Sequence, residues 1–257
     1  MNQSKEQVQS RLLPMAVVAI AVFIWWVISL FDLAPGSVFP SPGDVFSGFI
    51  EEVSTGRLFN DTVASLFRVT TGFGLAVILG IPLGLWMGSQ TLARDAFLPT
   101  INFFRNLSPL AWIPFAILWF GIGDAPAVFL IFMAAFFPIV LATFAAVANI
   151  PSVFFRVGRD YGMGRREMLK QITFPAIAPQ VITALRVTAG LSWLVVVAAE
   201  MIAGRDGLGF AIWDARNGLR MDLLVSGMIV IGVIGVILDW VLVQLTNIPS
   251  VRWGYER

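Results

Sequence analysis

Long apolar runs without a single charge constrain this chain more than any other feature. Residues 13–31 and 125–148 are two such runs, and neither contains Lys, Arg, Asp or Glu. About 20 apolar residues suffice for a helix to cross the hydrocarbon core of a bilayer. Apolar residues make up 58% of the 257 and charged residues only 13%. Because such a chain cannot cover its surface with polar groups, lipid must be the solvent for much of it.

We therefore predict an all-α, polytopic membrane protein that forms one domain over residues 1–257. A signal peptide is the alternative interpretation of the first apolar run, which follows Lys5 and Arg11. That run is long for a signal sequence and no small-x-small cleavage site follows it directly, so we interpret it as a retained span. About six transmembrane helices are expected, at 13–31, 63–88, 98–120, 125–148, 181–203 and 223–245.

The distribution of positive charge predicts which side each loop faces. The N-terminal segment, the break at 89–97, the loop at 150–179 and the C-terminal tail together carry ten Lys and Arg, against four on the opposite side. Cytosolic loops of membrane proteins carry the excess of Lys and Arg. Both termini and the 150–179 loop are therefore expected in the cytosol.

The segment from Arg156 to Pro179 is densely charged and carries five of the 17 Lys and Arg. Two helical patterns meet at Gly162-Met163-Gly164, where a backbone with positive φ is cheap only for glycine. The second helix is expected to end at Phe174-Pro175, since proline lacks the backbone donor. This basic helix-turn-helix is either a docking surface for a cytosolic partner or a connector whose charge only fixes topology.

Two further segments have a local pattern. Ser41 followed by Pro42 and Asp44 is typical of a helix start, and the apolar positions after it predict a short amphipathic helix at the membrane surface. Glycines at 80, 84 and 88 share one helical face and predict close approach of another helix. The segments 32–60 and 204–222 are expected as the main extracytoplasmic loops.

Five charged side chains lie inside the predicted spans, where they are costly. Counting inward from the cytosolic ends places Arg105, Arg186 and Asp239 at one depth, and Arg68 and Glu200 at another, near the outer face. We interpret them as two sets of interhelical partners. Either they hold the bundle together, or Arg105 or Arg186 lines a path for an anion.

Several functions are disfavoured by what the sequence lacks. There is no Cys and no His, so thiol and imidazole chemistry are absent, and we predict no metal site and no catalytic residue. The net charge of +1 gives no reason to expect nucleic acid. An intramembrane enzyme would need facing carboxylates, and Glu200 and Asp239 are expected at opposite depths. No phosphate-binding Gly-x-x-x-x-Gly-Lys-Ser/Thr motif is present, so ATP and Mg would belong to a partner.

The basic loop also contains a spaced sequence motif. Gly162 is followed by the apolar Ile172 and by Phe174-Pro175. In this order they resemble the cytosolic signature of the membrane subunits of ATP-binding cassette importers, which reads Glu-Ala-Ala, Gly, a hydrophobic residue and Leu-Pro. Here Arg156-Val157-Gly158 stands in place of Glu-Ala-Ala, so the carboxylate is absent and its charge is reversed. This departure concerns the salt bridges to the ATPase and leaves the fold expectation intact.

Other motifs are similar to the branch of that family that imports nitrate, taurine, other sulfonates and bicarbonate, and the resemblance covers about residues 15–245. The matching segments are Ser65-Leu66-Phe67-Arg68, Ser108-Pro109-Leu110-Ala111-Trp112-Ile113-Pro114, Trp119-Phe120-Gly121-Ile122-Gly123, Ala184-Leu185-Arg186, Val197-Ala198-Ala199-Glu200-Met201-Ile202 and Gly207-Leu208-Gly209.

The resemblance implies a MetI-like permease fold in the bacterial inner membrane and a role in ATP-driven import of a small anion. It also implies ATPase subunits, an extracytoplasmic binding protein and a second permease subunit, for which we expect a homodimer. The residues expected to couple to the ATPase are Arg156, Arg159, Asp160, Tyr161, Gly162, Met163, Gly164, Arg165 and Pro175. Those expected in the translocation path or in buried charge pairs are Arg68, Arg105, Ser108, Trp112, Arg186, Glu200 and Asp239. An ATP-independent channel or secondary carrier is the alternative.

Overall fold

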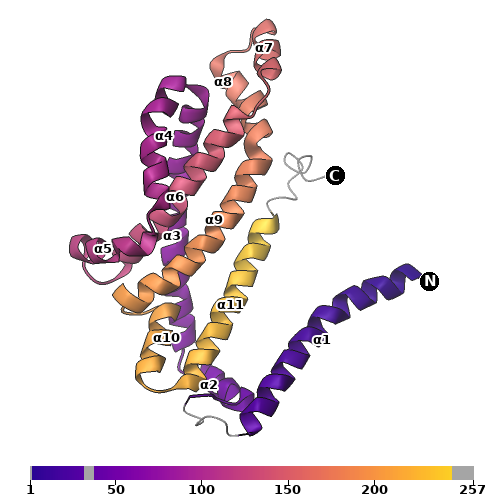
Figure 1. Ribbon diagram of the computed structural model, residues 1–257, viewed down its shortest axis with the longest axis vertical. Coiled ribbons are helices and arrows are strands. Elements are labelled where there is room, and N and C mark those ends of the chain that lie inside the picture. Colours follow the sequence, from indigo (N-terminus) through magenta and orange to yellow (C-terminus); the bar gives the residue numbers. More distant parts are fainter. Residues whose placement is uncertain (1, 32–37, 245–257) are drawn as a thin grey trace. The chain divides into compact units, whose positions relative to one another are not determined.

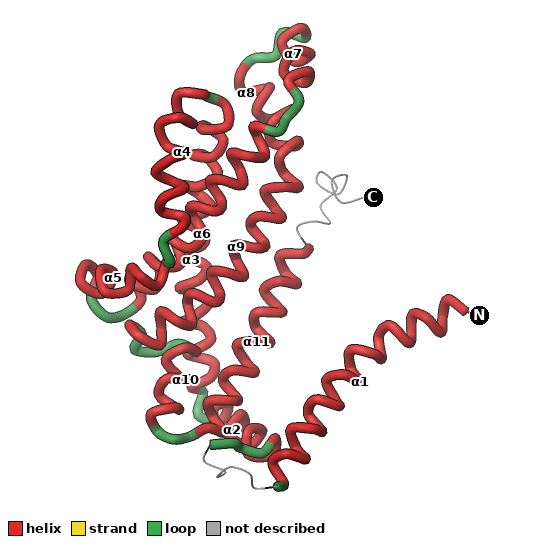
Figure 2. Tube along the Cα trace, viewed as in Figure 1, coloured by secondary structure: helices red, strands yellow, loops and turns green. Residues whose placement is uncertain are grey.

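The computed structural model describes residues 2–31 and 38–244, with side chains from residue 13 onward. Within these ranges every regular element is a helix and no strand is present (Figure 2), so the all-α prediction is confirmed. The C-terminal arginines Arg252 and Arg257, and the end of the last predicted span at residue 245, lie outside the described residues. The elements labelled in Figure 1 are α1 Asn2–Leu30, α2 Pro42–Ser54, α3 Arg57–Ser89, α4 Thr91–Asn106, α5 Ile113–Phe120, α6 Asp124–Ala148, α7 Ser152–Asp160, α8 Arg165–Met168, α9 Phe174–Ala203, α10 Leu208–Asn217 and α11 Met221–Gln244.

The chain forms two compact units. One contains residues 1–59 and 211–230, and the other contains residues 60–210 and 231–257. Within the described residues, five helices are long and apolar enough to cross a membrane. They are α1 from Leu13, α3, α6, the helix Arg165–Ala203 and α11. The chain is therefore a multi-pass membrane protein.

The prediction of one continuous span at 98–120 is wrong. Helix α4 ends at Asn106, and Leu107 and Ser108 are extended. A 3₁₀-helix, Pro109–Trp112, and the short α5 then follow. The residue before a proline is disfavoured in the α conformation, and two prolines, Pro109 and Pro114, interrupt this run. The apolar segment at 98–120 is thus divided into pieces that are each too short to span alone.

The expected helix end at Phe174-Pro175 is also wrong. Residues Arg165–Ala203 form one continuous apolar helix, in which the turn Leu169–Thr173 is π-helical. The amide of Phe174 donates to the carbonyl of Leu169, five residues back. A π turn widens the helix locally, and Pro175, which has no backbone donor, follows directly after this turn.

Helix α6 is the centre of the second unit. It packs along α9 and against α4 and α5, and its buried side chains include Leu130, Ile131 and Val140. The predicted close approach at Gly80, Gly84 and Gly88 is confirmed, with α6 as the partner. A Cβ added at Gly84 would lie 2.6 Å from the Cβ of Thr143, and one at Gly88 would lie 2.5 Å from the Cβ of Val147. These glycines let the two backbones meet.

The first unit contains the predicted surface helix. Ser41 caps α2 through its side chain, and the Asp44 carboxylate accepts from the Ser41 amide at 3.0 Å, so the predicted helix start is confirmed. The Trp25 indole of α1 donates to the carbonyl of Pro40 at 3.2 Å. Against Gly48 of α2 lies Leu223 of α11, whose Cδ2 would be 3.1 Å from an added Cβ.

The segment 204–222, which we expected as a polar loop between two spans, contains the helix α10. Its charges bind those of the 32–60 segment: Arg57 donates to Asp214 at 2.6 Å, and Arg220 donates to Glu51 at 2.7 Å. Hydrogen bonds from Arg220 to Asp222 and Glu51 raise the pKa of Arg220 above its ordinary value. These ion pairs hold α2, α10 and the start of α11 together within the first unit.

Candidate translocation and coupling sites

A buried arginine organises the end of α9 that lies far from α7 and α8. The side chain of Arg68 is 1% exposed, and that of Glu200, 2.7 Å away, is fully buried. Arg68 also donates to Asp124 through Nε at 2.7 Å, to the backbone carbonyl of Asp206 at 2.9 Å and to the Asp206 carboxylate. The pairing of Arg68 with Glu200 agrees with their predicted depth. We call Arg68, Asp124, Glu200 and Asp206 the Arg68 cluster.

The loop after α9 is bound to this cluster through its backbone. The amide of Gly209 donates to Glu200 at 2.9 Å, and the amide of Leu208 donates to the Ser65 hydroxyl at 3.0 Å. Gly207 has φ +101°, and a Cβ there would lie 2.5 Å from the Glu200 carboxyl carbon and 2.6 Å from Arg68 Nη1. Only glycine fits such a position. The cluster therefore joins α3, the start of α6, the end of α9 and the start of α10.

Three acidic residues near this cluster were not singled out from the sequence. Asp124 begins α6 and Asp206 lies in the loop after α9. Asp61, in the second turn of α3, accepts from the Gly207 amide at 2.8 Å. A depth count over spans finds charges inside helices but cannot find those contributed by turns. The usable signal was that all three lie within a few residues of a predicted span end.

The second predicted pair is also present. Arg186 of α9 donates to Asp239 of α11 through Nε at 2.5 Å and Nη2 at 2.7 Å, a bidentate arrangement. The expectation that this pair is buried is wrong for the single chain, because the side chains are 43% and 50% exposed. The pair thus lies on an uncovered surface of two membrane helices.

Other predicted path residues do not join either pair. Arg105 lies in the last turn of α4, is exposed and makes no ion pair among the described residues. Ser108 precedes the 3₁₀-helix and is exposed. Trp112 packs among Phe104 and Phe129, with ring centroids 6.1 and 6.3 Å away. The structure therefore places Trp112 in an aromatic cluster, and it does not bring Arg105 to Arg186 and Asp239.

The basic helix-turn-helix consists of α7, the turn 161–164 and α8, and it lies at one end of α6 and α9 (Figure 1). Gly162 has φ +75°, as its position in the turn predicted, whereas Gly164 has φ −71°. Gly158 and Thr173 are buried, and a Cβ at Gly158 would lie 2.8 Å from Ile172. The predicted coupling side chains are mostly exposed: Arg156, Arg159, Asp160, Tyr161, Arg165 and Pro175, with Met163 half-buried.

These features together define a helical membrane component with a surface element at one end and paired charges within its spans. Residues 80–247 match the family described as "Binding-protein-dependent transport system inner membrane component". The match covers well over half of the chain, so the chain belongs to this family of transport components. The fold agrees: a chain of the MetNI methionine ABC transporter, in an inward-facing conformation, superposes with a TM-score of 0.59 at 17% identity, covering 74% of this chain and 96% of that one.

Three relatives are similar over nearly the whole length. The nitrate import permease protein NrtB of Synechocystis sp. is 34% identical, over 88% of this chain and 84% of its own. The taurine transport system permease protein TauC of Escherichia coli is 31% identical over the same shares. The bicarbonate transport system permease protein CmpB of Synechococcus elongatus is 32% identical, over 91% of this chain and 88% of its own.

Proposed function

We propose that this chain is the permease subunit of an ATP-driven importer for a small anionic or sulfonate-bearing solute. Its membership in the family of binding-protein-dependent transport components is the observation that carries the proposal. The named relatives transport nitrate, taurine and bicarbonate. Two of these solutes are anions and the third bears a sulfonate, so a cationic group in the pathway suits all three.

The coupling element in this proposal is α7 and α8 with their turn. Tyr161 at its tip is 81% exposed, and Arg156 and Arg166 near it are exposed as well. Because α8 runs without interruption into α9, a displacement of α8 by the ATPase would be transmitted along a rigid helix to Arg186. ATP and Mg belong to the ATPase in this mechanism, and both chain termini and this element lie in the cytosol.

The pathway in this proposal is lined by the face of α9 and α11 that carries Arg186 and Asp239. An exposed ion pair within membrane helices is costly against hydrocarbon. A water-filled path on this face would remove that cost and would place the guanidinium where an anion passes. A second copy of the chain would close the path, since so few helices cannot enclose one, and a twofold homodimer is the simplest arrangement.

An extracytoplasmic binding protein would deliver the solute to α2 and α10, whose segments lie on the outer side in the predicted topology.

The alternative of an intramembrane enzyme would need two carboxylates that face each other, but Glu200 and Asp239 each bind their own arginine. Arg186 and Glu200 lie 14 positions apart on α9, or roughly 21 Å at 1.5 Å per residue.

Gly162→Asp tests the coupling role. Its φ of +75° strains any side chain, by about 1–3 kcal/mol for non-glycine residues, and should tilt α8. We expect normal membrane insertion, a loss of co-purified ATPase, and a parallel fall of about tenfold in ATP hydrolysis and solute uptake in proteoliposomes. Gly164→Asp is the matched control, because it adds the same charge two residues away at φ −71°, where Asp is a good helix cap.

If the Gly162→Asp protein inserts correctly and transports at full rate with the ATPase bound, the coupling role is wrong. Equal losses in both variants would assign the effect to charge and not to the turn. Uptake that persists without ATP or ATPase would favour the channel or secondary carrier instead.

A further inference from the structure

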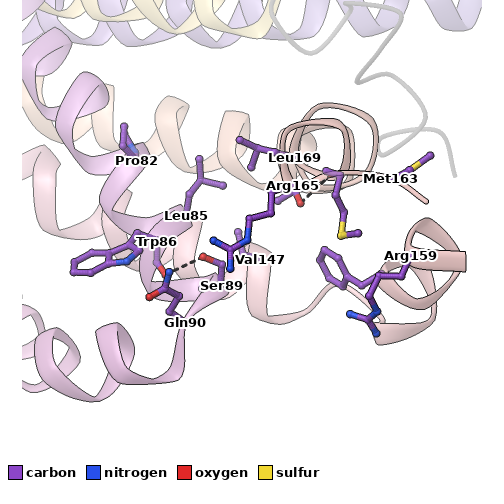
Figure 3. Close-up of a pocket in the computed structure, with 14 residues that line it drawn as sticks. Pro82, Leu85, Trp86, Ser89, Gln90, Val147, Arg159, Met163, Arg165 and Leu169 are labelled. Atoms are coloured by element: carbon purple, nitrogen blue, oxygen red, sulfur yellow. Dashed lines mark hydrogen bonds between the residues drawn. The ribbon is translucent and has the colours of Figure 1, made fainter. Parts of the chain in front are cut away.

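A cavity of about 970 Å³ opens between the end of α3, the end of α6 and the segment from α7 to the π turn (Figure 3). All of these elements belong to the second unit. The volume is in the range of sites that hold small ligands. The lining residues are Pro82, Leu85, Trp86, Gly88, Ser89, Gln90, Val147, Phe155, Arg159, Met163, Arg165, Met168, Leu169 and Thr173.

The charges of this cavity are all of one sign. Arg159 and Arg165 line it, and no Asp or Glu does. Neither arginine makes an ion pair with any described residue. Figure 3 shows Arg165 extending from α8 toward Ser89 and Gln90 at the end of α3. The site therefore offers two guanidinium groups, a hydroxyl and an amide to an anion.

The rest of the wall is apolar and belongs to a membrane helix. Pro82, Leu85 and Trp86 lie in the last two turns of α3, a candidate span, and Trp86 is 44% exposed. Tryptophan is enriched where a membrane helix meets the headgroups. The polar residues Ser89 and Gln90 follow at once, so the cavity passes from apolar to cationic at the depth where a bilayer does the same.

We propose that this cavity binds an anionic phospholipid. Its phosphate would contact Arg159 and Arg165, and its acyl chains would lie along Pro82, Leu85 and Trp86. Basic pockets at the cytoplasmic ends of membrane helices suit such headgroups. A free phosphate would satisfy the arginines but would leave the apolar wall exposed to water. A lipid in this site would join the end of α3 to α7 and α8 through a ligand.

The test uses the full-length chain in nanodiscs of mixed phosphatidylglycerol and phosphatidylethanolamine, with bound lipid identified by native mass spectrometry. Each arginine near an anionic headgroup contributes about a fivefold preference, so two give about 25-fold. We expect phosphatidylglycerol to be enriched on the native chain and Arg159→Gln/Arg165→Gln to lose about 25-fold of that enrichment. Arg156→Gln/Arg166→Gln is the matched control, because it removes the same charge from α7 and α8 outside the cavity, and should retain the enrichment.

A second variant, Leu85→Trp, places a bulky ring on the apolar wall where the acyl chains would lie while keeping both arginines, and should also lose the enrichment. Absence of enrichment on the native chain would overturn the proposal. Equal loss in the control pair would overturn it too, since surface charge alone would then attract the lipid. Displacement of the lipid by inorganic phosphate at millimolar concentration would assign the site to a free anion.

Discussion

Two arginine–carboxylate pairs, each with one member on α9, have the same chemistry but differ in their surroundings. Arg68 and Glu200 are buried and share hydrogen bonds with two further carboxylates, a serine and the backbone of a loop. Arg186 and Asp239 are half exposed and bind each other bidentately. Both pairs consist of charges in membrane helices, so burial is what separates them.

This difference indicates two roles. A buried charge is tolerated only when its remaining hydrogen-bonding capacity is satisfied, and the Arg68 cluster meets that requirement with contacts from four segments. Removing one member leaves the others unpaired. The Arg186–Asp239 pair is about half exposed, so water or another anion can reach it and Asp239 can be replaced as a partner at small cost to the fold. The first pair is therefore suited to holding the helices together and the second to meeting a solute.

Arg68→Met should have the largest effect on stability. It leaves Glu200 charged and fully buried without its cation, and breaking a buried pair in this way costs about 3–5 kcal/mol. The free energy of unfolding in mixed micelles titrated with sodium dodecyl sulfate measures the change. Arg105→Met is the control, because Arg105 is exposed at the end of α4. Equal stability of the two variants would contradict the structural role of the Arg68 cluster.

A glycine beside each pair sharpens the same contrast. Gly207→Ala would place a Cβ 2.5 Å from the Glu200 carboxyl carbon at φ +101°, which should cost about 2–3 kcal/mol through strain and overpacking. Gly190 lies one turn from Arg186, and a Cβ there meets nothing within 4 Å. Gly190→Ala should therefore stabilise the helix by about 0.5–1 kcal/mol. The same unfolding titration measures both, and a loss in Gly190→Ala would mean that this face is closely packed.

The sequence predicted those parts of the fold that lipid dictates. Uncharged runs such as 125–148 must be helical, because hydrocarbon leaves the backbone no other partner. The two wrong predictions, a continuous span at 98–120 and a helix end at Phe174-Pro175, both concern prolines whose effect depends on the surrounding structure. Helix α4 ends three residues before Pro109, which begins a 3₁₀-helix, whereas Pro175 follows a π turn within a continuous helix. Sequence spacing alone does not say which of these a proline will do.

The site was predicted in its pairs but not in its surroundings. Depth along a helix is linear in residue number, so the partners of Arg68 and Arg186 followed from counting. Burial depends on which helices cover a face, and the sequence does not reveal that. Asp124 and Asp206 come from turns, whose conformations depend on tertiary contacts such as the hydrogen bonds to Arg68.

Asp239→Asn should have a smaller effect than Arg68→Met or Gly207→Ala, and it tests whether water reaches the pair of Arg186 and Asp239. The chain has no cysteine, so Val236→Cys, one turn away on α11 and 71% exposed as valine, gives a clean reporter. Removing the negative charge of Asp239, about 7 Å from the introduced thiol in water, should raise the rate at which that thiol reacts with an anionic thiosulfonate by about threefold. The rate with a cationic thiosulfonate should fall by the same factor. Proteoliposomes and mass spectrometry measure both rates.

Ile78→Cys is the control reporter, on α3 and 67% exposed as isoleucine, but without a charge pair beside it. If that face meets lipid, neither reagent should label it, because a thiol in hydrocarbon ionises too rarely to react. Failure of Val236→Cys to react would mean that water does not reach this face, and it would contradict the assignment of Arg186 and Asp239 to a water-filled path. Asp239→Asn should then destabilise the protein as Arg68→Met does, because it would leave Arg186 as an unpaired charge that water does not reach.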